Sequence, residues 1–459
     1  MEQITKPHCG ARLDRLPDCR WHSSMFAIVA FGLLVCWSNA VGGLILAQLK
    51  ALGWTDNSTT ATFSAITTAG MFLGGLVGGI IGDKTGRRNA FILYEAIHIA
   101  SMAVGAFSPN MDFLIACRFV MGVGLGALLV TLFAGFTEYM PGRNRGTWSS
   151  RVSFIGNWSY PLCSLIAMGL TPLISAEWNW RVQLLIPAIL SLIATALAWR
   201  YFPESPRWLE SRGRYQEAEK VMRSIEEGVI RQTGKPLPPV VIADDGKAPQ
   251  AVPYSALLTG VLLKRVILGS CVLIAMNVVQ YTLINWLPTI FMTQGINLKD
   301  SIVLNTMSMF GAPFGIFIAM LVMDKIPRKT MGVGLLILIA VLGYIYSLQT
   351  SMLLITLIGF FLITFVYMYV CYASAVYVPE IWPTEAKLRG SGLANAVGRI
   401  SGIAAPYAVA VLLSSYGVTG VFILLGAVSI VVAIAIATIG IETKGVSVES
   451  LSIDAVANK

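Results

Sequence analysis

Charged residues are scarce in this sequence. Asp, Glu, Lys and Arg make up 12% of the 459 residues, whereas 56% of the residues are hydrophobic. Soluble domains carry about 25% charged residues, and a soluble core could not enclose this much apolar surface. The scarcity of charge therefore excludes an ordinary soluble protein.

Cysteine pairs at metal-ligand spacing are also lacking. The seven cysteines are scattered, and five of them lie inside apolar stretches: Cys36, Cys117, Cys163, Cys271 and Cys371. Neither a disulfide framework nor a zinc site is indicated, so we expect no metal and no cofactor. No nucleophile, metal cluster or acid pair stands out in the polar segments, and we therefore expect no enzymatic activity.

The sequence does contain many long apolar runs. We count about twelve, each of roughly 19 to 30 residues, and a run of about 18 residues can cross a bilayer as a helix. The first run is too long for a signal peptide and is predicted to be a retained helix. The sequence thus predicts an all-α polytopic membrane protein with twelve transmembrane helices. The runs cover residues 24–49, 59–82, 89–108, 112–136, 149–174, 181–202, 264–293, 301–323, 330–348, 352–378, 391–414 and 418–440.

The net charge is +9, and the positions of the basic residues decide what this means. If both termini are inside, most of the 33 Lys and Arg residues fall in inner segments, while Lys50, Arg181 and Lys299 lie in outer loops. This is the positive-inside pattern of membrane proteins, and it argues against nucleic acid as a partner. It predicts a protein in the lipid bilayer of a cell inner membrane, with both termini cytoplasmic. We expect it to be a monomer.

One long polar segment, residues 204–263, separates the sixth and seventh runs. Residues 215–231 place charged side chains around a regular apolar stripe, which predicts an amphipathic helix. Residues 235–253 are rich in Pro, Asp and Gly and predict a flexible linker. The segment divides the chain into two predicted bundles of six helices, residues 1–203 and 264–459.

The two halves echo each other in sequence. The segment Asp83-Lys84-Thr85-Gly86-Arg87-Arg88 matches Asp324-Lys325-Ile326-Pro327-Arg328-Lys329, and Glu138-Tyr139-Met140-Pro141 matches Glu380-Ile381-Trp382-Pro383. Both echoes have an offset of about 240 residues, which indicates an internal repeat. Parallel six-helix repeats are an architecture of secondary transporters, whose substrate site lies near the middle of the membrane between the halves.

Asp83 needs a partner in such an arrangement. It lies at the C-terminal end of a helix, where the helix dipole disfavours a carboxylate, and Arg87, Arg88 or the N-terminus of another helix are candidates. We hypothesise that the charges around Asp83 link the two halves in one transport conformation and release them in the other. The alternative is that they only anchor the loop among lipid headgroups, which would explain the bases but neither the acid nor the repeat.

These motifs resemble those of the major facilitator superfamily, in particular its sugar porters and the related bacterial metabolite symporters. The matching segments are Pro203-Glu204-Ser205-Pro206-Arg207-Trp208-Leu209 and residues 79–88, 118–126, 379–384 and 442–445. The chain also resembles inner-membrane metabolite transport proteins of enteric bacteria. The resemblance implies alternating access and a cytoplasmic charge network, in which Glu204 and Arg207, Glu138 and Arg145, and Glu380 and Arg389 take part. With the repeated motifs, the expected network is Asp83, Arg87, Arg88, Glu138, Arg145, Glu204, Arg207, Asp324, Arg328, Glu380 and Arg389.

Two departures from the family pattern bear on mechanism. Proton-coupled sugar porters carry an aspartate on the first helix, and this chain has Ser38 in that place. Serine does not titrate near neutral pH, so proton coupling through this position is not expected, and Glu95 or Glu138 becomes the next candidate. The tenth run has Cys371-Tyr372-Ala373 where sugar porters carry Gly-Pro-Trp, so strict hexose specificity does not follow from the resemblance.

Ionisable side chains within the apolar runs are functional candidates, because burying them in a bilayer is costly. A guanidinium binds a carboxylate in a bidentate geometry, so Arg118 and Arg399 could each bind a sugar acid or another small organic anion. The alternative for Arg118 is a structural bond to backbone carbonyls. Glu95 and His98 share a helix face and are candidates for proton coupling, with a hydrogen-bonded structural pair as the alternative.

A sugar or polyol site needs amides and hydroxyls for directional hydrogen bonds and aromatic faces for the apolar side of the ring. We expect a secondary transporter of a small polar metabolite, sugar or sugar-like, driven by protons or by the substrate gradient. Transport of a small organic anion or sugar acid is the alternative, and a transport-incompetent nutrient sensor is a further one. The candidate substrate-binding residues are Trp37, Asn39, Arg118, Asn157, Trp158, Asn277, Gln280, Tyr281, Asn285, Trp286, Tyr369, Tyr372 and Arg399.

Overall fold

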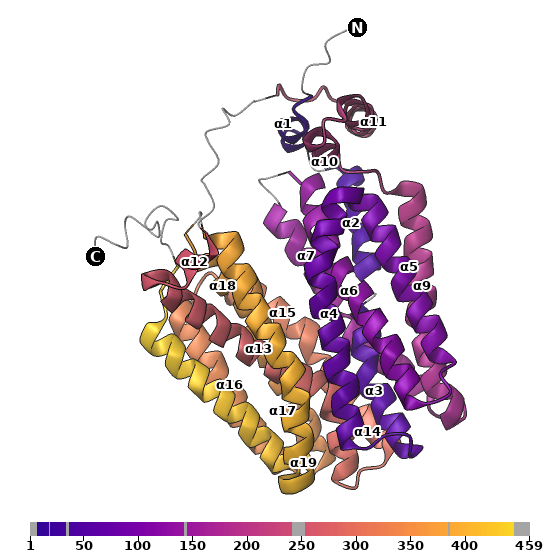
Figure 1. The fold of residues 1–459 in the computed structure, drawn as a ribbon, viewed down its shortest axis with the longest axis vertical. Helices are drawn as coiled ribbons and strands as arrows, with labels where there is room; N and C mark the ends of the chain where they lie inside the picture. Colours follow the sequence, from indigo (N-terminus) through magenta and orange to yellow (C-terminus); the bar gives the residue numbers. More distant parts are fainter. Residues whose placement is uncertain are drawn as a thin grey trace. The chain divides into compact units, whose positions relative to one another are not determined.

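The computed structural model describes residues 7–17, 19–33, 36–141, 145–240, 253–383 and 386–444. These residues form helices and connecting turns, with no strand among them (Figure 1). Ten helical stretches of the described chain are long and apolar enough to cross a membrane. The all-α, multi-pass membrane fold expected from the sequence is therefore confirmed. Part of the predicted linker, residues 241–252, and the tail from residue 445 lie outside the described residues.

The chain divides into two compact units. Unit 1 comprises Met1–Ser38, Gly70–Ser159 and Leu184–Gly246, and unit 2 comprises Asn39–Ala69, Tyr160–Gln183 and Lys247–Lys459. Four of the boundaries fall inside α3, α4, α8 and α9, so these helices contribute residues to both units. The predicted division at residues 203 and 264 follows the sequence repeat, and it stays a prediction.

Unit 1 contains most of the N-terminal helices. Asn110 begins α6 by accepting a hydrogen bond from the Phe113 N–H at 2.9 Å, as an N-cap residue does. Gly86, with a φ of 97°, turns the chain between α4 and α5. The helices are α1 (Cys9–Asp14), α2 (Arg20–Leu33), α5 (Arg87–Ala106), α6 (Met111–Tyr139), α7 (Arg145–Asn157), α10 (Pro206–Ser211) and α11 (Tyr215–Thr233), with the C-terminal parts of α4 (Asn57–Thr85) and α9 (Ala176–Tyr201).

Glycines let α4 and α6 approach each other closely within unit 1. Gly70, Gly74 and Gly78 recur at every fourth residue of α4, and a Cβ on any of them would collide with α6 between residues 119 and 127. Small residues at this spacing allow helix backbones to pack tightly in membranes. The spacing of these glycines therefore sets the contact between the two helices.

Unit 2 contains the C-terminal helices. Close packing recurs here, since a Cβ at Gly311 or Gly315 would collide with α17 at Thr364. The helices are α8 (Ser159–Leu170), α12 (Tyr254–Leu257), α13 (Gly260–Thr293), α14 (Leu298–Met309), α15 (Gly311–Val322), α16 (Arg328–Ser347), α17 (Met352–Cys371), a π-helix (Tyr372–Tyr377), α18 (Val378–Glu380) and α19 (Lys387–Ile439), with most of α3 (Trp37–Ala51) and the first parts of α4 and α9.

The predicted runs differ from the observed helices in three places. The fifth run breaks at Trp158 into α7 and α8, and the eighth breaks at Phe310 into α14 and α15. Pro161 and Pro313 explain both breaks, because each lacks the N–H that would bond to the carbonyl four residues earlier. The last two runs form one helix, α19, in which Gly417 alone has a non-helical backbone, with a φ of 65°.

The polar segments also contain helices. The amphipathic helix predicted at residues 215–231 is α11. The sequence does not predict α1, because six residues are too few to show a periodic pattern. Figure 1 shows α1, α10 and α11 together, and they share a buried apolar cluster, the loop core. Its residues are Cys9, Leu13, Leu16, Trp208, Leu209, Ala218, Met222, Ile225 and Val229.

Candidate functional site

A first charge cluster, formed by Asp83, Arg87, Glu138 and Glu204, lies in unit 1 where α4 ends and α5 begins. Arg87 at the start of α5 donates to Asp83 Oδ1 at 2.7 Å and to Glu138 Oε1 at 2.9 Å. The Arg87 and Glu138 side chains are only 16% and 20% exposed. Arg87 thus supplies the partner that a carboxylate at the C-terminal end of α4 needs.

Glu204 caps α5 from a distant part of the chain. Its carboxylate accepts hydrogen bonds from the Arg87 N–H at 2.7 Å and the Arg88 N–H at 3.3 Å. A negative charge is favourable at this end of a helix. Burial nevertheless raises the pKa of Glu204 above its ordinary value, against these backbone hydrogen bonds. Its carboxylate fills the space beside Gly86, where a Cβ would collide with it.

The segment between α9 and α11 is tied to the same place. Trp208 Nε1 donates to the Asp83 carbonyl at 2.7 Å, and Arg207 Nε donates to the Glu138 carbonyl at 3.1 Å. Arg207 also pairs with Asp14 at 2.9 Å. The family resemblance implies that Glu204 and Arg207 take part in one network, and in the structure they bond to separate partners rather than to each other.

A second charge cluster, formed by Asp324, Arg328, Glu380 and Glu442, repeats this geometry in unit 2. Arg328 at the start of α16 donates to Asp324 Oδ1 at 3.1 Å and to Glu380 Oε2 at 3.0 Å. Glu442 accepts from the Arg328 N–H at 2.7 Å and the Lys329 N–H at 3.1 Å. Each residue of the first cluster therefore has a counterpart here.

Two tyrosines extend the correspondence. The Tyr139 hydroxyl donates to the Pro203 carbonyl at 2.7 Å, and the Tyr377 hydroxyl donates to the Ile441 carbonyl at 3.0 Å. Pro203 precedes Glu204 and Ile441 precedes Glu442, so each tyrosine fixes the residue before a capping glutamate. Our candidate residues omit Glu442, although it follows the last helix of its half as Glu204 does.

Other expected members of the network lie apart from these pairs. Glu380 pairs with Arg328 rather than with Arg389, whose guanidinium lies 5.1 Å from the centre of the Tyr254 ring. Arg88 donates to the Trp199 carbonyl at 2.6 Å. The side chain of Arg145 lies outside the described part of the structure. The ion pairs described for each cluster join residues of one unit, so the hypothesis that the clusters link the halves stays a prediction.

Buried polar groups gather on α5 and its neighbours in unit 1. Glu95 and His98 are fully buried, and His98 Nδ1 lies 3.9 Å from Glu95 Oε2, which is too far for a hydrogen bond. His98 Nδ1 instead lies 3.1 Å from Ser191 Oγ on α9. The hydrogen-bonded Glu95–His98 pair that we considered is therefore not formed, and His98 is held by α9.

Arg118 has a backbone partner. Its side chain is 2% exposed and donates to the carbonyl of Ser38 at 2.7 Å. Ser38 Oγ in turn contacts the sulfur of Met121 at 3.4 Å. This geometry matches the structural alternative for Arg118, and it places the guanidinium beside the residue that stands where sugar porters have an acid.

In unit 2, α13 and α19 bring several candidates close together. A Cβ at Gly398 would lie 3.0 Å from the amide nitrogen of Asn277, and one at Gly402 would lie 3.2 Å from the Tyr281 ring. Arg399 lies between these two glycines. Its Nη1 is shielded from solvent and has no hydrogen-bond partner among the described residues.

The remaining candidates lie around this pair of helices or elsewhere. Tyr369 donates to the Val272 carbonyl of α13 at 3.1 Å, and its ring lies 5.7 Å from that of Tyr372. Asn157 donates to the Ser153 carbonyl of its own helix at 2.8 Å, and Trp158 is 36% exposed. Trp37 and Asn39 on α3 are buried, and so are Asn285 and Trp286 on α13. Gln280 on α13 is half-buried.

No three His, Cys, Asp or Glu side chains of the described chain are grouped so that they could hold a metal ion. The polar groups of both units are arginines, carboxylates, amides and tyrosine hydroxyls, which can pair helix ends and bind polar solutes.

A model of the Major Facilitator Superfamily matches residues 26–406, which is more than half of the chain. The chain belongs to this superfamily. This superfamily member is 99% identical to the putative metabolite transport protein YdjK of Escherichia coli (strain K12), over the full length of both. It is 44% identical to the inner membrane metabolite transport protein YdjE of the same organism, over 98% of this chain and 99% of that protein.

A solved structure shares the fold of this chain. The xylose transporter XylE from E. coli, in a partially occluded inward-open conformation, matches with a TM-score of 0.74 at 18% identity, over 94% of this chain and 100% of that one. At this identity the likeness shows the fold. The superfamily fold and the resemblance given by the motifs are confirmed, and the family and the relatives above are transport proteins rather than enzymes.

Proposed function

We propose that this superfamily member is a secondary transporter that moves a small polar metabolite across the cell inner membrane by alternating access, with both termini in the cytoplasm. The paired charge clusters support this, because equivalent residues hold equivalent helix ends in both halves, as parallel repeats of a transporter do. Relatives at 26% identity are named as transporters of niacin, inositol and arabinose, so the choice of substrate class rests on the residues of this chain.

The proposed substrate is a small organic anion, such as a sugar acid, and Arg399 carries this choice. Its Nη1 lies away from solvent without a partner among the described residues, and an unsatisfied buried donor of this kind is costly. A carboxylate of the substrate would satisfy it with two parallel hydrogen bonds. Arg118 contributes less to the choice, because it already donates to the Ser38 carbonyl.

A neutral sugar or polyol is the second candidate. Asn277 and Tyr281 line the side of α13 that faces Gly398 and Gly402, and Gln280 lies beside them in sequence. Amides and a phenol could bind the hydroxyls of an uncharged ring. Glu95 is the proposed proton carrier, because its buried carboxylate lacks a hydrogen-bond partner in the described structure.

Uptake into proteoliposomes of a neutral sugar and its sugar acid would test the proposal. We expect preference for the acid, and a loss of about 10- to 100-fold in kcat/KM for the acid in Arg399→Gln, since a hydrogen bond to a charged group contributes about 1.5 to 3 kcal/mol. Arg399→Lys should retain part of the activity, and Lys264→Gln, which removes an exposed charge, should retain all of it.

Three outcomes would count against parts of the proposal. If Arg399→Gln takes up each compound as fast as the unchanged protein does, Arg399 has a structural role and does not bind substrate. If an imposed proton gradient does not change uptake of the acid, transport is not coupled to protons and Glu95 is not a proton carrier. Binding without flux would indicate a sensor rather than a transporter.

A further inference from the structure

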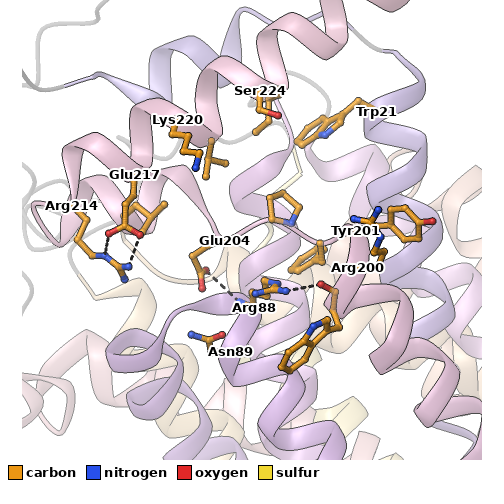
Figure 2. Close-up of a pocket in the computed structure, with 16 residues that line it drawn as sticks. Trp21, Arg88, Asn89, Arg200, Tyr201, Glu204, Arg214, Glu217, Lys220 and Ser224 are labelled. Carbon is orange, nitrogen blue, oxygen red and sulfur yellow. Dashed lines mark hydrogen bonds and ion pairs between the residues drawn. The ribbon is translucent and has the colours of Figure 1, made fainter.

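A cavity of about 740 Å³ opens in unit 1 where α5 begins, α9 ends and α11 lies across them. We call it the α5–α11 pocket. None of its lining residues belongs to the charge clusters except Glu204. Its lining includes Arg88, Trp199, Arg200, Tyr201, Lys220 and Ser224 (Figure 2).

Positive charge predominates in this pocket. Four bases line it, Arg88, Arg200, Arg214 and Lys220, against two acids, Glu204 and Glu217. Both acids are already engaged: Glu204 accepts from the N-terminus of α5, and Glu217 forms two hydrogen bonds with Arg214 at 2.6 and 2.7 Å.

Three bases remain without a carboxylate partner among the described residues: Arg88, Arg200 and Lys220. Arg88 is held in place by the Trp199 carbonyl at 2.6 Å, which leaves its other N–H groups available. Figure 2 shows Lys220 projecting from α11 toward the side that carries Arg88 and Arg200. The pocket is therefore suited to an anion.

The position of the pocket at the ends of membrane-spanning helices indicates where the anion comes from. Both α5 and α9 are membrane-spanning by length and composition, and the pocket lies at the first turn of one and the last turn of the other. Trp199 and Tyr201 are 64% and 61% exposed there, and such aromatic side chains favour the headgroup level of a bilayer. Basic pockets between helices at that level bind the phosphates of lipid headgroups.

We propose that the α5–α11 pocket binds the phosphodiester headgroup of an anionic phospholipid, with Arg88, Arg200 and Lys220 around the phosphate. The aromatic rings of Trp199 and Tyr201 face the glycerol and upper acyl chains. The bound lipid joins α11 to the ends of α5 and α9, and this role is independent of the substrate that is transported.

Native mass spectrometry of the full-length protein would test this, with phosphatidylglycerol and phosphatidylcholine of the same acyl chains as probes. We expect phosphatidylglycerol to bind more tightly, and the triple variant Arg88→Gln, Arg200→Gln, Lys220→Gln to weaken its binding about 10-fold or more, since each base near an anionic surface contributes measurably. A control triple variant, Arg231→Gln, Lys235→Gln, Lys264→Gln, removes the same charge elsewhere and should change binding less than about 2-fold.

Ser224→Trp provides a second test that leaves every charge in place. It fills the pocket from α11, so it should also weaken phosphatidylglycerol binding, even if the triple variant fails to fold. Equal binding by Ser224→Trp and the unchanged protein, or an equal loss in the control triple variant, would overturn the proposal. Competition by sn-glycerol 3-phosphate at similar concentration would show instead that the site takes a soluble phosphate.

Discussion

Arg328 has more strong partners than any other side chain in its cluster. It forms two hydrogen bonds with Glu380, one with Asp324 and one with the Met323 carbonyl, and its side chain is 7% exposed. Asp324 is 90% exposed, so the pair with Glu380 matters more, because solvent screens exposed pairs. The stability of this cluster therefore depends on one guanidinium.

Removing that guanidinium should be costly. We expect Arg328→Gln to lower the free energy of unfolding by about 2 kcal/mol, because the half-buried Glu380 carboxylate loses its charged partner and keeps, among the described residues, only the hydrogen bond from Thr443, and to slow transport. Lys325→Gln removes the same charge from the same loop and should change stability by less than about 0.5 kcal/mol. Thermal unfolding in detergent measures both. Equal stability of the two variants would show that the cluster contributes nothing measurable.

At the scale of elements, glycines decide how closely α4 and α6 pack. We expect Gly74→Ala to destabilise the protein by about 2 to 3 kcal/mol, because its Cβ would meet the backbone of α6 at Val123 and overpacking is strained. Gly169→Ala is the matched control in α8, where a Cβ meets nothing within 4 Å. It should be neutral or stabilise by up to about 1 kcal/mol. Folded yield and thermal unfolding compare them, and a neutral Gly74→Ala would contradict the close contact.

The N-terminal clasp is a second element-scale feature, formed by Arg12 and Arg15 of the α1 segment with Glu219 and Glu226 of α11. Arg12 and Arg15 bond to Glu226 at 2.7 and 2.6 Å, and Arg12 also pairs with Glu219. Burial opposes ionisation of Glu226, but hydrogen bonds from Arg12 and Arg15 outweigh it and hold the pKa of this carboxyl below its ordinary value. Cys9 on α1 belongs to the loop core beneath α11, and burial raises the pKa of its thiol to about 12.

The clasp should open in acid. A depressed carboxyl pKa contributes stability above the ordinary Glu value, about 4.3, and this contribution is lost as the pH falls through the lower folded value. We expect Cys9 to become reactive to 4,4′-dithiodipyridine below about pH 4, and in Glu226→Gln already at pH 7. Glu227→Gln on the same helix is the control, and mass spectrometry of the Cys9 peptide gives the readout. Slow labelling of Cys9 in Glu226→Gln at pH 7 would contradict the role of the clasp.

At the scale of the whole molecule, the sequence predicts the helical membrane fold well and the partners of single residues poorly. Twelve apolar runs are enough to predict the helices, because length and hydropathy decide membrane insertion. The echo of Asp83 and Glu138 in Asp324 and Glu380 locates both charge clusters. The exact pairings depend on loops whose path no local pattern shows, so the sequence places Glu204 in the charge network but does not show that it caps the N-terminus of α5.

The same limit applies to the remaining differences. The short helix α1 depends on α10 and α11 for its stability and carries no periodic signal of its own. Pro161 and Pro313 do signal the breaks in two predicted runs, since each stands four residues after the last residue of a helix. Burial of Glu95 and Arg118 follows from their place in apolar runs, but the Ser38 carbonyl that Arg118 binds is not apparent from the sequence.

The capping glutamates have a consequence for the order in which the protein is made. Glu204 is 117 residues beyond Arg87, and Glu442 is 114 residues beyond Arg328. At about 5 to 20 residues per second, the ribosome needs roughly 10 seconds to reach the acid that completes a helix already in the membrane. During that interval the first turns of α5 and α16 lack their acceptor. Each half of the newly made chain is complete only when the segment with Glu204 or Glu442 has reached the start of α5 or α16.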